Sequence, residues 1–341
     1  MSLIEEIHQQ PVVIEQAIAA NTAHIDRIAA DLDPGDFDYV MIAARGTSDN
    51  AARYAQYVLG ICNRLPVALA APSLFGRYNS APDLSRALVI GLSQSGASPD
   101  LVEVLAEARR QHRPTVAITN VAESPLAAVG DEIIELRAGE ERAVAATKTY
   151  TTELLAVAML SSALAGEGAA PASLASITPD MSQVLALGDE IAGAAQLVAE
   201  AERVVVVGRG FHQATAFEWA LKLQELTYVL AQPYAEPDFR HGPRAVVEAD
   251  FPILMVASEG PVLEGMIDLS GDVMEEGATV IAVTDQPDFP STTSIALPPG
   301  PEWVSPLVAA IAIQLFAFHL ARAKGIDPDQ PRHISKVTRT R

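Results

Sequence analysis

Short uncharged apolar runs, each followed by a polar turn and an amphipathic stretch, recur along this chain. Residues 87–92 (ALVIGL) carry no charge, which is typical of a strand buried on both faces. After a polar turn, apolar side chains recur at the spacing of one helix face: Leu101, Val104, Leu105 and Ala108. Ser98 is a favourable N-cap and Pro99 suits the first helical position, so the pattern predicts a strand, a tight turn and a helix.

The turn itself, residues 93–98 (SQSGAS), combines three serines, a glutamine and a glycine. Free backbone N–H groups meet the positive end of the helix dipole at such a turn, and hydroxyl groups add donors without adding charge. The pattern therefore favours binding of a phosphate group on a small molecule. Alternatively, serine and glycine simply form a turn, and the loop by itself leaves both interpretations open.

The rest of the first half continues this alternation. Residues 1–30 have a partial apolar helix face, and residues 31–38 form a polar turn. Residues 143–165 are predicted to be helical, and residues 166–179, rich in small side chains, Gly and Pro, are predicted to be a linker. Short apolar runs predict further strands at residues 39–44, 67–70, 115–119 and 133–136.

The strand pattern repeats after the linker at a nearly constant offset. Three runs match others located 164 or 165 residues later, and the paired runs end at Gly46 and Gly210, Ser93 and Ser258, and Asn120 and Asp285. The fold class is therefore predicted to be α/β, with two copies of one domain, each a parallel sheet covered by helices. We expect an N-terminal helical segment, a first domain, a linker, a second domain and a C-terminal tail, at residues 1–30, 31–165, 166–180, 181–325 and 326–341.

The second copy differs from the first where chemistry is expected. In place of the serine loop it has residues 258–261 (SEGP), so we expect this copy to bind no phosphate. Its first helix instead carries Glu218, Lys222 and Glu225, which share one helix face. A solvated, salt-bridged face is the usual explanation of such a triple. However, the neighbouring residues are largely apolar, and charges on a mostly buried helix need a role.

The sequence also argues against nucleotide cofactors, metal ions, nucleic acid and anionic membranes. Residues 208–213 (GRGFHQ) lack the third glycine of a dinucleotide-binding loop, and there is no P-loop, so no cofactor is expected. The net charge of −20 argues against nucleic acid or an anionic membrane surface as a partner. With Cys62 as the single cysteine and with scattered histidines, neither a disulfide nor a metal site is expected. A reducing, cytoplasmic location fits this composition.

Two further stretches bear on location. The N-terminal residues 1–10 contain two glutamates and no long apolar run, so a secretory signal is not expected. The most apolar helix candidate, residues 303–318, is interrupted by Pro306 and Gln314 and is short for a membrane span. We interpret it as a buried helix.

The motifs taken together resemble a known family, the sugar-isomerase (SIS) double domain. The resemblance covers nearly the whole chain and is strongest to the isomerase half of glutamine–fructose-6-phosphate aminotransferases. It implies two flavodoxin-like domains with five-stranded parallel sheets, and a homodimer with shared active sites. The segments that carry it are residues 46–48 (GTS), the serine loop, residues 144–148 (VAATK), 218–225, 241–243 (HGP) and 329–336.

The resemblance also implies which residues bind the sugar phosphate. A hydroxyl-rich turn would hold the phosphate, and a second turn and a backbone segment would line the sugar. The phosphate would be bound by Ser93, Gln94, Ser95 and Ser98. The sugar would be lined by Thr47 and Ser48 and by the backbone near Val144 and Ala145.

The implied catalytic residues come from the second half of the chain. Glu225 would be the base that moves a proton between C1 and C2, supported by Lys222 and Glu218. His241, contributed by the neighbouring subunit, would assist ring opening, because histidine titrates near neutral pH. Lys336 would form a Schiff base or steady the open-chain carbonyl. Taken alone, His241 could simply lie in a capped turn and Lys336 in a solvated basic tail.

The expected activity follows from what the chain shares with this family and from what it lacks. The first sugar-isomerase strand is reached by Tyr39, so we expect no glutaminase domain and no use of glutamine as an ammonia source. The favoured function is isomerising deamination of glucosamine 6-phosphate to fructose 6-phosphate and ammonia. A fructosamine-6-phosphate deglycase, an ammonia-dependent aminotransferase and a non-catalytic sugar-phosphate sensor stay open. Ala146, where the family often has serine, leaves the identity of the substrate open as well.

Overall fold

The computed structural model describes residues 2–336 and divides the chain into two compact units. Neither unit is continuous in sequence. Unit 1 consists of residues 1–11, 142–147 and 176–334. Unit 2 consists, among the described residues, of residues 12–141, 148–175 and 335–336.

Unit 2 contains a parallel sheet that, among the described residues, has five strands. They are β1 (Tyr39–Ala43), β2 (Val67–Leu69), β3 (Ala87–Ser93), β4 (Thr115–Thr119) and β5 (Glu132–Glu135). The order is β2-β1-β3-β4-β5, and Val40 of β1 pairs with Val67 on one side and Leu88 on the other. Every residue of β3 and β4 is buried, as the uncharged runs predicted.

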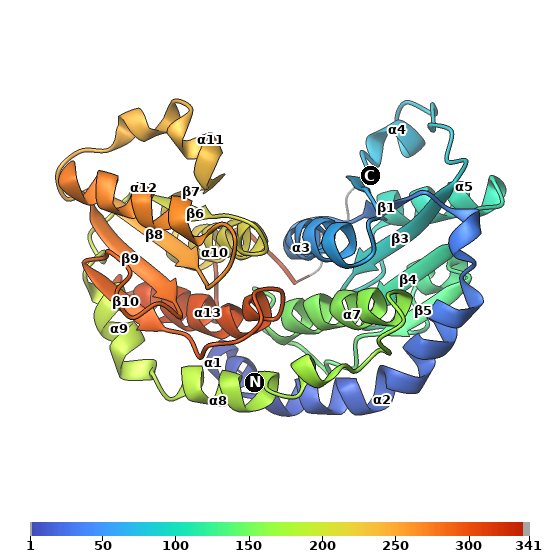
Figure 1. Ribbon diagram of the computed structural model, residues 1–341, viewed down its shortest axis with the longest axis horizontal. Coiled ribbons are helices and arrows are strands. Elements are labelled where there is room, and N and C mark those ends of the chain that lie inside the picture. The colour runs from blue at the N-terminus through green and yellow to red at the C-terminus, as the bar shows by residue number, and fades with distance from the viewer. Residues whose placement is uncertain (1, 337–341) are drawn as a thin grey trace. The chain divides into compact units, whose positions relative to one another are not determined.

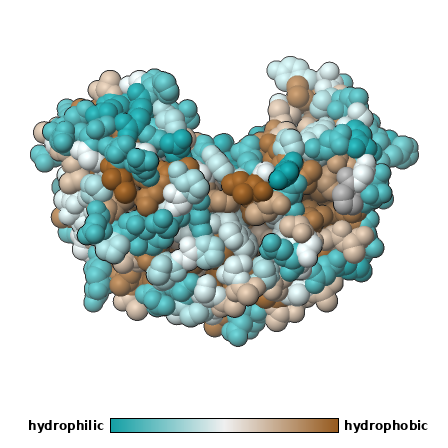
Figure 2. Space-filling model, viewed as in Figure 1, coloured by the Kyte–Doolittle hydropathy of each residue, from teal (hydrophilic) through white to brown (hydrophobic). Residues whose placement is uncertain are grey.

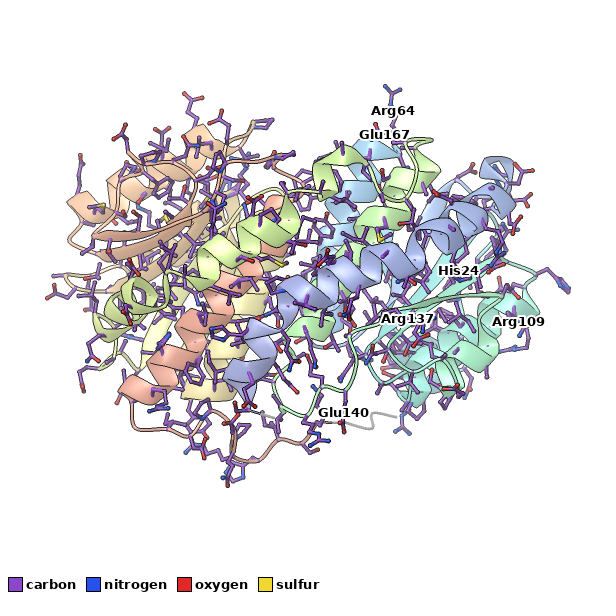
Figure 3. The ribbon with its side chains drawn as sticks, turned by 90° about the horizontal axis from the view of Figure 1, so that it is seen from below. His24, Arg64, Arg109, Arg137, Glu140 and Glu167 are labelled. Atoms are coloured by element: carbon purple, nitrogen blue, oxygen red, sulfur yellow. The ribbon has the colours of Figure 1, made fainter. Side chains whose placement is uncertain are left out.

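Helices cover both faces of this sheet. The apolar face of α5 packs on β3 and β4 through Leu101, Val104 and Leu105, while α3 and α7 pack together on the other side (Figure 1). On α2, His24 lies close to β5 (Figure 3), where its Nε2 contacts the carbonyl oxygen of Ile133 at 2.7 Å. The helices are α2 (Gln10–Asp31), α3 (Thr47–Cys62), α4 (Ser73–Gly76), α5 (Pro99–Arg110), α6 (Pro125–Val129) and α7 (Lys148–Leu164), with short 3-10 helices η1 (Pro34–Asp36) and η2 (Ala172–Leu174).

Unit 1 repeats the same topology. Its strands are β6 (Arg203–Gly208), β7 (Leu230–Ala235), β8 (Pro252–Ala257), β9 (Thr279–Thr284) and β10 (Thr293–Ala296). The order β10-β9-β8-β6-β7 is that of unit 2 read from the other edge, and all its pairings are parallel. The prediction of two α/β domains with parallel five-stranded sheets is therefore confirmed for the described part of the chain.

The helices of unit 1 place α12 on one side of its sheet and α9 and α13 on the other (Figure 1). The core under α12 joins Met266, Leu269 and Val273 to Val207 of β6 and Met255 of β8. The helices are α1 (Leu3–His8), α8 (Ile177–Leu185), α9 (Gly188–Gln196), α10 (His212–Thr227), α11 (Glu236–Arg240), α12 (Leu263–Glu275) and α13 (Ser305–Ala323), with the 3-10 helix η3 (Pro243–Val246).

The most apolar helix is α13. By length and composition it is the one helix among residues 2–336 that could cross a membrane. Its most apolar stretch of 18 residues has a mean hydropathy of 1.6, and 83% of that stretch is buried. It packs against α1, α8, α9 and α10 of its own unit. Its apolar surface is therefore used in the core of unit 1, as the sequence predicted for a buried helix.

Two predicted elements differ from the observed ones. The helix expected at residues 143–165 begins only at Lys148. The preceding residues are irregular because the buried Glu6 carboxylate accepts the backbone N–H groups of Arg142 and Ala143, at 2.6 and 3.2 Å. The predicted linker contains η2 and the first residues of α8, so it is partly helical despite its many small residues.

Candidate active site

The strand order of unit 2 identifies where a ligand binds best. In a flavodoxin-like sheet the crevice at the switch point, between the carboxyl ends of β1 and β3, is the usual ligand site. The chain leaves β1 and enters α3 at Thr47 and Ser48, and it leaves β3 through the serine loop, residues 93–98, before α5. Thr47, Ser48, Ser93, Gln94, Ser95 and Ser98 thus all lie at this switch point.

The serine loop is held by its own hydroxyl groups. Ser93 Oγ accepts the backbone N–H of Gly96 at 3.2 Å, and Ser95 Oγ accepts that of Ala97 at 3.3 Å. Gly96 has a φ of +58°, and a Cβ there would lie 2.1 Å from Ser124 Oγ, so only glycine fits. A hydroxyl that accepts an N–H bond can still donate its own hydrogen to an anion. The loop is therefore compatible with phosphate binding.

Ser98 occupies the predicted N-cap position of α5, with Pro99 at the first turn. Its side chain makes no capping hydrogen bond, which differs from the usual use of an N-cap serine. Ser93 is 7% exposed, and Ser95 and Ser98 are partly exposed. Hydroxyl groups and the N-terminus of α5 consequently lie on the same short turn, where an anion is stabilised by the helix dipole.

Glu153 and Glu141 are buried carboxylates of unit 2 that were not predicted. Ser48 Oγ donates to Glu153 Oε1 at 2.7 Å, and Glu153, on α7, is 1% exposed. Glu141, whose side chain is fully buried, accepts the N–H of Thr149 at 3.1 Å and its hydroxyl at 2.7 Å. Glu153 is the single acidic residue of the long α7, which was a usable signal, but no sequence pattern distinguished Glu141.

Lys336 is placed on one of these carboxylates. Its Nζ lies 2.5 Å from Glu141 Oε2, and the lysine side chain is 21% exposed. Next to this pair, the Lys148 Nζ donates to the carbonyl oxygen of Glu140 at 2.6 Å; Glu140 lies on the irregular segment after β5 (Figure 3). Lys336 is thus anchored to unit 2, so a freely solvated basic tail does not describe this residue.

Val144 and Ala145, predicted to present backbone groups to the sugar, lie in the irregular segment that belongs to unit 1. Ala145 is buried. The end of this segment is fixed because the carbonyl oxygen of Thr147 accepts from Gln314 Nε2 at 3.3 Å, and Gln314 in turn accepts from Gln10 Nε2 at 2.6 Å. Its backbone is therefore held by buried amide side chains.

In unit 1 the three charged residues of α10 form a buried ion triplet. Lys222 Nζ lies 3.4 Å from Glu218 Oε1 and is hydrogen bonded to Glu225 Oε2. The side chains of Lys222 and Glu218 are 1% and 0% exposed, whereas that of Glu225 is 24% exposed. Burial lowers the pKa of Lys222, but the two carboxylates outweigh it and hold the pKa above its ordinary value. The interpretation as a solvated face is therefore wrong, and Glu225 is the carboxylate of the triplet that solvent reaches.

His241 lies between α11 and η3 on the surface of unit 1. Its backbone N–H caps α11 by contacting the carbonyl oxygens of Pro237 and Asp238, at 3.2 and 3.3 Å. The imidazole is exposed. The predicted catalytic residues are thus divided: Glu218, Lys222, Glu225 and His241 belong to unit 1, and Lys336 belongs to unit 2.

The switch point of unit 1, between β6 and β8, is closed by its own side chains. His212 Nε2 lies 3.0 Å from Ser258 Oγ, and burial lowers the pKa of this histidine to about 3. The N–H of Glu259 contacts both carboxylate oxygens of Asp285, at 3.0 and 3.2 Å. Ser258 and Glu259 correspond to the start of the serine loop, and both are engaged by side chains of their own unit. That this copy binds no phosphate stays a prediction. Within residues 2–336, no group of three or more His, Cys, Asp or Glu side chains is arranged to hold a metal ion.

Comparison with known proteins matches both units to one family. The family model described as SIS domain matches residues 38–163 and 197–323. The isomerizing glutamine–fructose-6-phosphate aminotransferase of Zymomonas mobilis is 32% identical over 351 residues, which cover 97% of this chain and 58% of that protein. The chain therefore spans somewhat more than half the length of this relative.

Solved structures extend the similarity to the whole fold. The C-terminal domain of glucosamine-fructose-6-phosphate aminotransferase from Francisella tularensis is 27% identical, with a TM-score of 0.86 over 96% of this chain and 98% of that one. A protein from Silicibacter pomeroyi DSS-3, proposed to be a phosphosugar isomerase, is 30% identical, with a TM-score of 0.86 over 96% and 100% of the two chains. This chain belongs to the SIS domain family and carries two SIS domains in tandem.

Proposed function

We propose that this chain is a phosphosugar isomerase that deaminates an amino-sugar 6-phosphate, converting glucosamine 6-phosphate into fructose 6-phosphate and ammonia. The observation that carries the proposal is the ion triplet of α10. In this triplet the buried Lys222 binds Glu225, and Glu225 is the one member of the triplet that solvent reaches. The similarity to proteins named as aminotransferases and phosphosugar isomerases supports the substrate class.

The reaction needs one proton to move between neighbouring carbons. In the open-chain aldehyde, the C2 proton is acidic because it lies beside the carbonyl group. Glu225 takes this proton and returns it to C1, while the carbonyl oxygen gains a proton and the amine nitrogen loses one, so that C1 becomes an alcohol and C2 an imine. Water then hydrolyses the imine, which leaves a ketone at C2 and releases ammonia. The ammonium group of Lys222 holds the Glu225 side chain in place through their hydrogen bond.

The other residues have supporting roles in the proposal. The serine loop binds the 6-phosphate through hydroxyl groups and the N-terminus of α5. His241, exposed on unit 1, is donated to the site of a second copy in a homodimer and assists ring opening. Lys336 steadies the open-chain carbonyl or forms a Schiff base with it, once its ammonium group leaves Glu141.

One alternative deserves a test of its own, because the relatives are named as aminotransferases. Run in reverse with free ammonia, the same proton transfer converts fructose 6-phosphate into glucosamine 6-phosphate. A fructosamine 6-phosphate would use the same base with a bulkier amine as the leaving group. Sugar-phosphate binding without turnover would instead indicate a sensor.

A substrate screen tests the proposal. Ammonia release is measured with glucosamine 6-phosphate, free glucosamine and a fructosamine 6-phosphate, and formation of glucosamine 6-phosphate is measured from fructose 6-phosphate with ammonium chloride. We expect the highest kcat/KM with glucosamine 6-phosphate. Turnover of the fructosamine phosphate alone, or tight binding of sugar phosphates without any turnover, would overturn the proposal in favour of a deglycase or a sensor.

A further inference from the structure

The segment that carries His241 is short and has little apolar support after the histidine. We call residues 236–246, which include α11 and η3, the His241 segment. Before the histidine, Phe239 is fully buried against the sheet core. After it, Gly242 has a φ of +135°, and η3 buries no side chain. Within the segment, hydrophobic packing therefore fixes only the first half, and the next side chain packed against this core is Val247, directly after the segment.

Ion pairs to α12 hold the second half. Arg240 Nη1 lies 2.8 Å from Asp272 Oδ2, and Arg244 Nη1 lies 3.0 Å from the same oxygen. The two arginines stand directly before and three residues after the histidine. One carboxylate of α12 thus bridges the two ends of the turn that presents His241, and it does so with hydrogen-bonded, charge-assisted contacts.

Further carboxylates extend this bridge into a network. Arg240 is also paired with Glu236, which accepts from Arg209 Nη1 at 2.8 Å, and Arg244 Nη2 lies 2.6 Å from Glu276. The side chain of Glu236 is 4% exposed. A single surface ion pair contributes little to stability, whereas a network with a buried member holds a defined geometry.

The backbone of α12 is shaped for the same contacts. Arg240 Nη2 donates to the carbonyl oxygen of Gly265 at 3.3 Å. A Cβ on Gly265 would lie 3.0 Å from Arg209 Nη1 and 3.3 Å from Glu236 Oε2, so a larger residue would press on the inner ion pair.

The hydrogen bond from Arg240, together with the charges of both arginines, lowers the pKa of Asp272. Asp272 is therefore a carboxylate at neutral pH. Figure 2 shows that the surface over α11 and α12 is mostly hydrophilic.

We propose that Asp272 is a positioning residue for His241, which it acts on through Arg240 and Arg244. This inference rests on the proposed function, in which His241 serves the active site of a second copy of the chain. A histidine that reaches across to another subunit cannot be oriented by that site until the site is assembled. Its own subunit must hold the turn beforehand, and the Asp272 bridge does so without contacting the imidazole.

The test combines backbone mobility with kinetics. Asp272→Asn keeps the shape of the side chain and removes its charge, and Glu276→Gln breaks only the outer pair. Asp31→Asn is the matched control, because Asp31 forms an exposed ion pair with Arg27 at 2.8 Å in unit 2. We expect amide hydrogen exchange at residues 240–247 to speed up most in Asp272→Asn, less in Glu276→Gln and not in Asp31→Asn.

The kinetic arm is a double-mutant cycle with His241→Ala. Because misplacing a catalytic group by about 1 Å can cost up to about 100-fold, we expect Asp272→Asn to lower kcat by roughly 10-fold or more with an unchanged KM. Asp272→Glu, which restores the charge, should recover part of this loss. In the His241→Ala background the same substitution should have no further effect.

Two different failures can be told apart. If His241→Ala leaves turnover unchanged, the proposed role of His241 fails, and the positioning role of Asp272 fails with it. If His241→Ala lowers turnover but Asp272→Asn exchanges and turns over like the parent protein, only the positioning role is overturned. Equal losses from Asp272→Asn in both backgrounds also overturn it, because that result describes a structural residue.

Discussion

The loops at the two switch points differ in what their side chains contact. In unit 2 the loops after β1 and β3 carry hydroxyl side chains. In unit 1 the loops after β6 and β8 carry His212 and Ser258, which contact each other. The sheets share one strand order and therefore one switch point each. At the first, the serine hydroxyls accept loop N–H groups and can still donate hydrogen bonds. At the second, His212 contacts Ser258, and Asp285 accepts the N–H of Glu259.

The difference shows how a duplicated fold can divide its work. Filling the second switch point with its own carboxylate and imidazole removes the free donors that an anion needs. The helix that leaves this switch point, α10, carries the ion triplet instead. In our proposal unit 2 supplies the groups that bind the phosphate, and unit 1 supplies the groups that move protons. Four experiments can break or sharpen this comparison.

The largest effect is expected from removing the base in unit 1. Glu225→Gln keeps the size of the side chain but cannot take a proton, so turnover should fall by about 10²–10⁴-fold. Sugar-phosphate affinity should change little, because the serine loop belongs to the other unit. Turnover is measured together with deuterium incorporation from solvent at C1 or C2. Glu190→Gln, at an exposed position on α9, is the control. If Glu225→Gln turns over and exchanges deuterium like the parent protein, the triplet has a purely structural role.

The second effect distinguishes the two switch points directly. Ser93→Ala combined with Ser95→Ala should weaken binding of the sugar phosphate, at about 1.5–3 kcal/mol for each hydrogen bond lost to a charged group. Ser258→Ala, at the corresponding loop of unit 1, should leave this affinity unchanged. Calorimetry with phosphorylated and free sugar provides the measurement. Equal affinity of the parent protein for the two sugars would contradict the assignment of the serine loop.

A third experiment tests the closed switch point through its histidine. Burial lowers the pKa of His212 to about 3 from its ordinary 6.5, so between these values the unfolded chain binds a proton that the folded chain excludes. Stability is therefore unaffected by this group above about pH 6.5 and falls below it, by about 1.4 kcal/mol for each pH unit. Urea unfolding at several pH values should show a shallower pH dependence in His212→Gln than in the exposed control His112→Gln. An unchanged slope would mean that His212 is protonated in the folded chain.

The smallest expected signal concerns the homodimer. Glu225→Gln and His241→Ala subunits should each be inactive, and mixing them under conditions of subunit exchange should restore activity. If each site takes one residue from each subunit, half of the random dimers are mixed and each has one intact site, so about a quarter of the parental activity should return. Proven mixed dimers without recovered activity would place His241 in the site of its own chain.

The strands and the serine loop could be predicted because their signals are local. An uncharged run such as residues 115–119 has to be buried, and the observed β4 has the same bounds. The start of α5 followed from Ser98 and Pro99, whose backbone preferences act within one turn. The closed switch point was partly foreseen, since residues 258–261 had lost the hydroxyl cluster.

Contacts between distant segments could not be predicted in this way. The late start of α7 depends on Glu6, which binds backbone N–H groups more than a hundred residues away. Glu141 has no distinguishing neighbours in the sequence, and its link to Lys336 spans 195 positions. The Asp272 bridge likewise joins residues 28 and 32 apart, which no periodic pattern relates.

By itself the sequence determined two α/β domains, the position of a hydroxyl-rich loop in the first, and a charged face on the leading helix of the second, because periodicity and turn chemistry act over a few residues. Only the tertiary structure decided that this face is a buried triplet with Glu225 at its accessible end, that Lys336 rests on Glu141, and that Asp272 bridges the arginines around His241. The reason is physical: burial and ion pairing depend on which distant side chains are brought within a few ångströms, and the pattern of one segment does not contain that information.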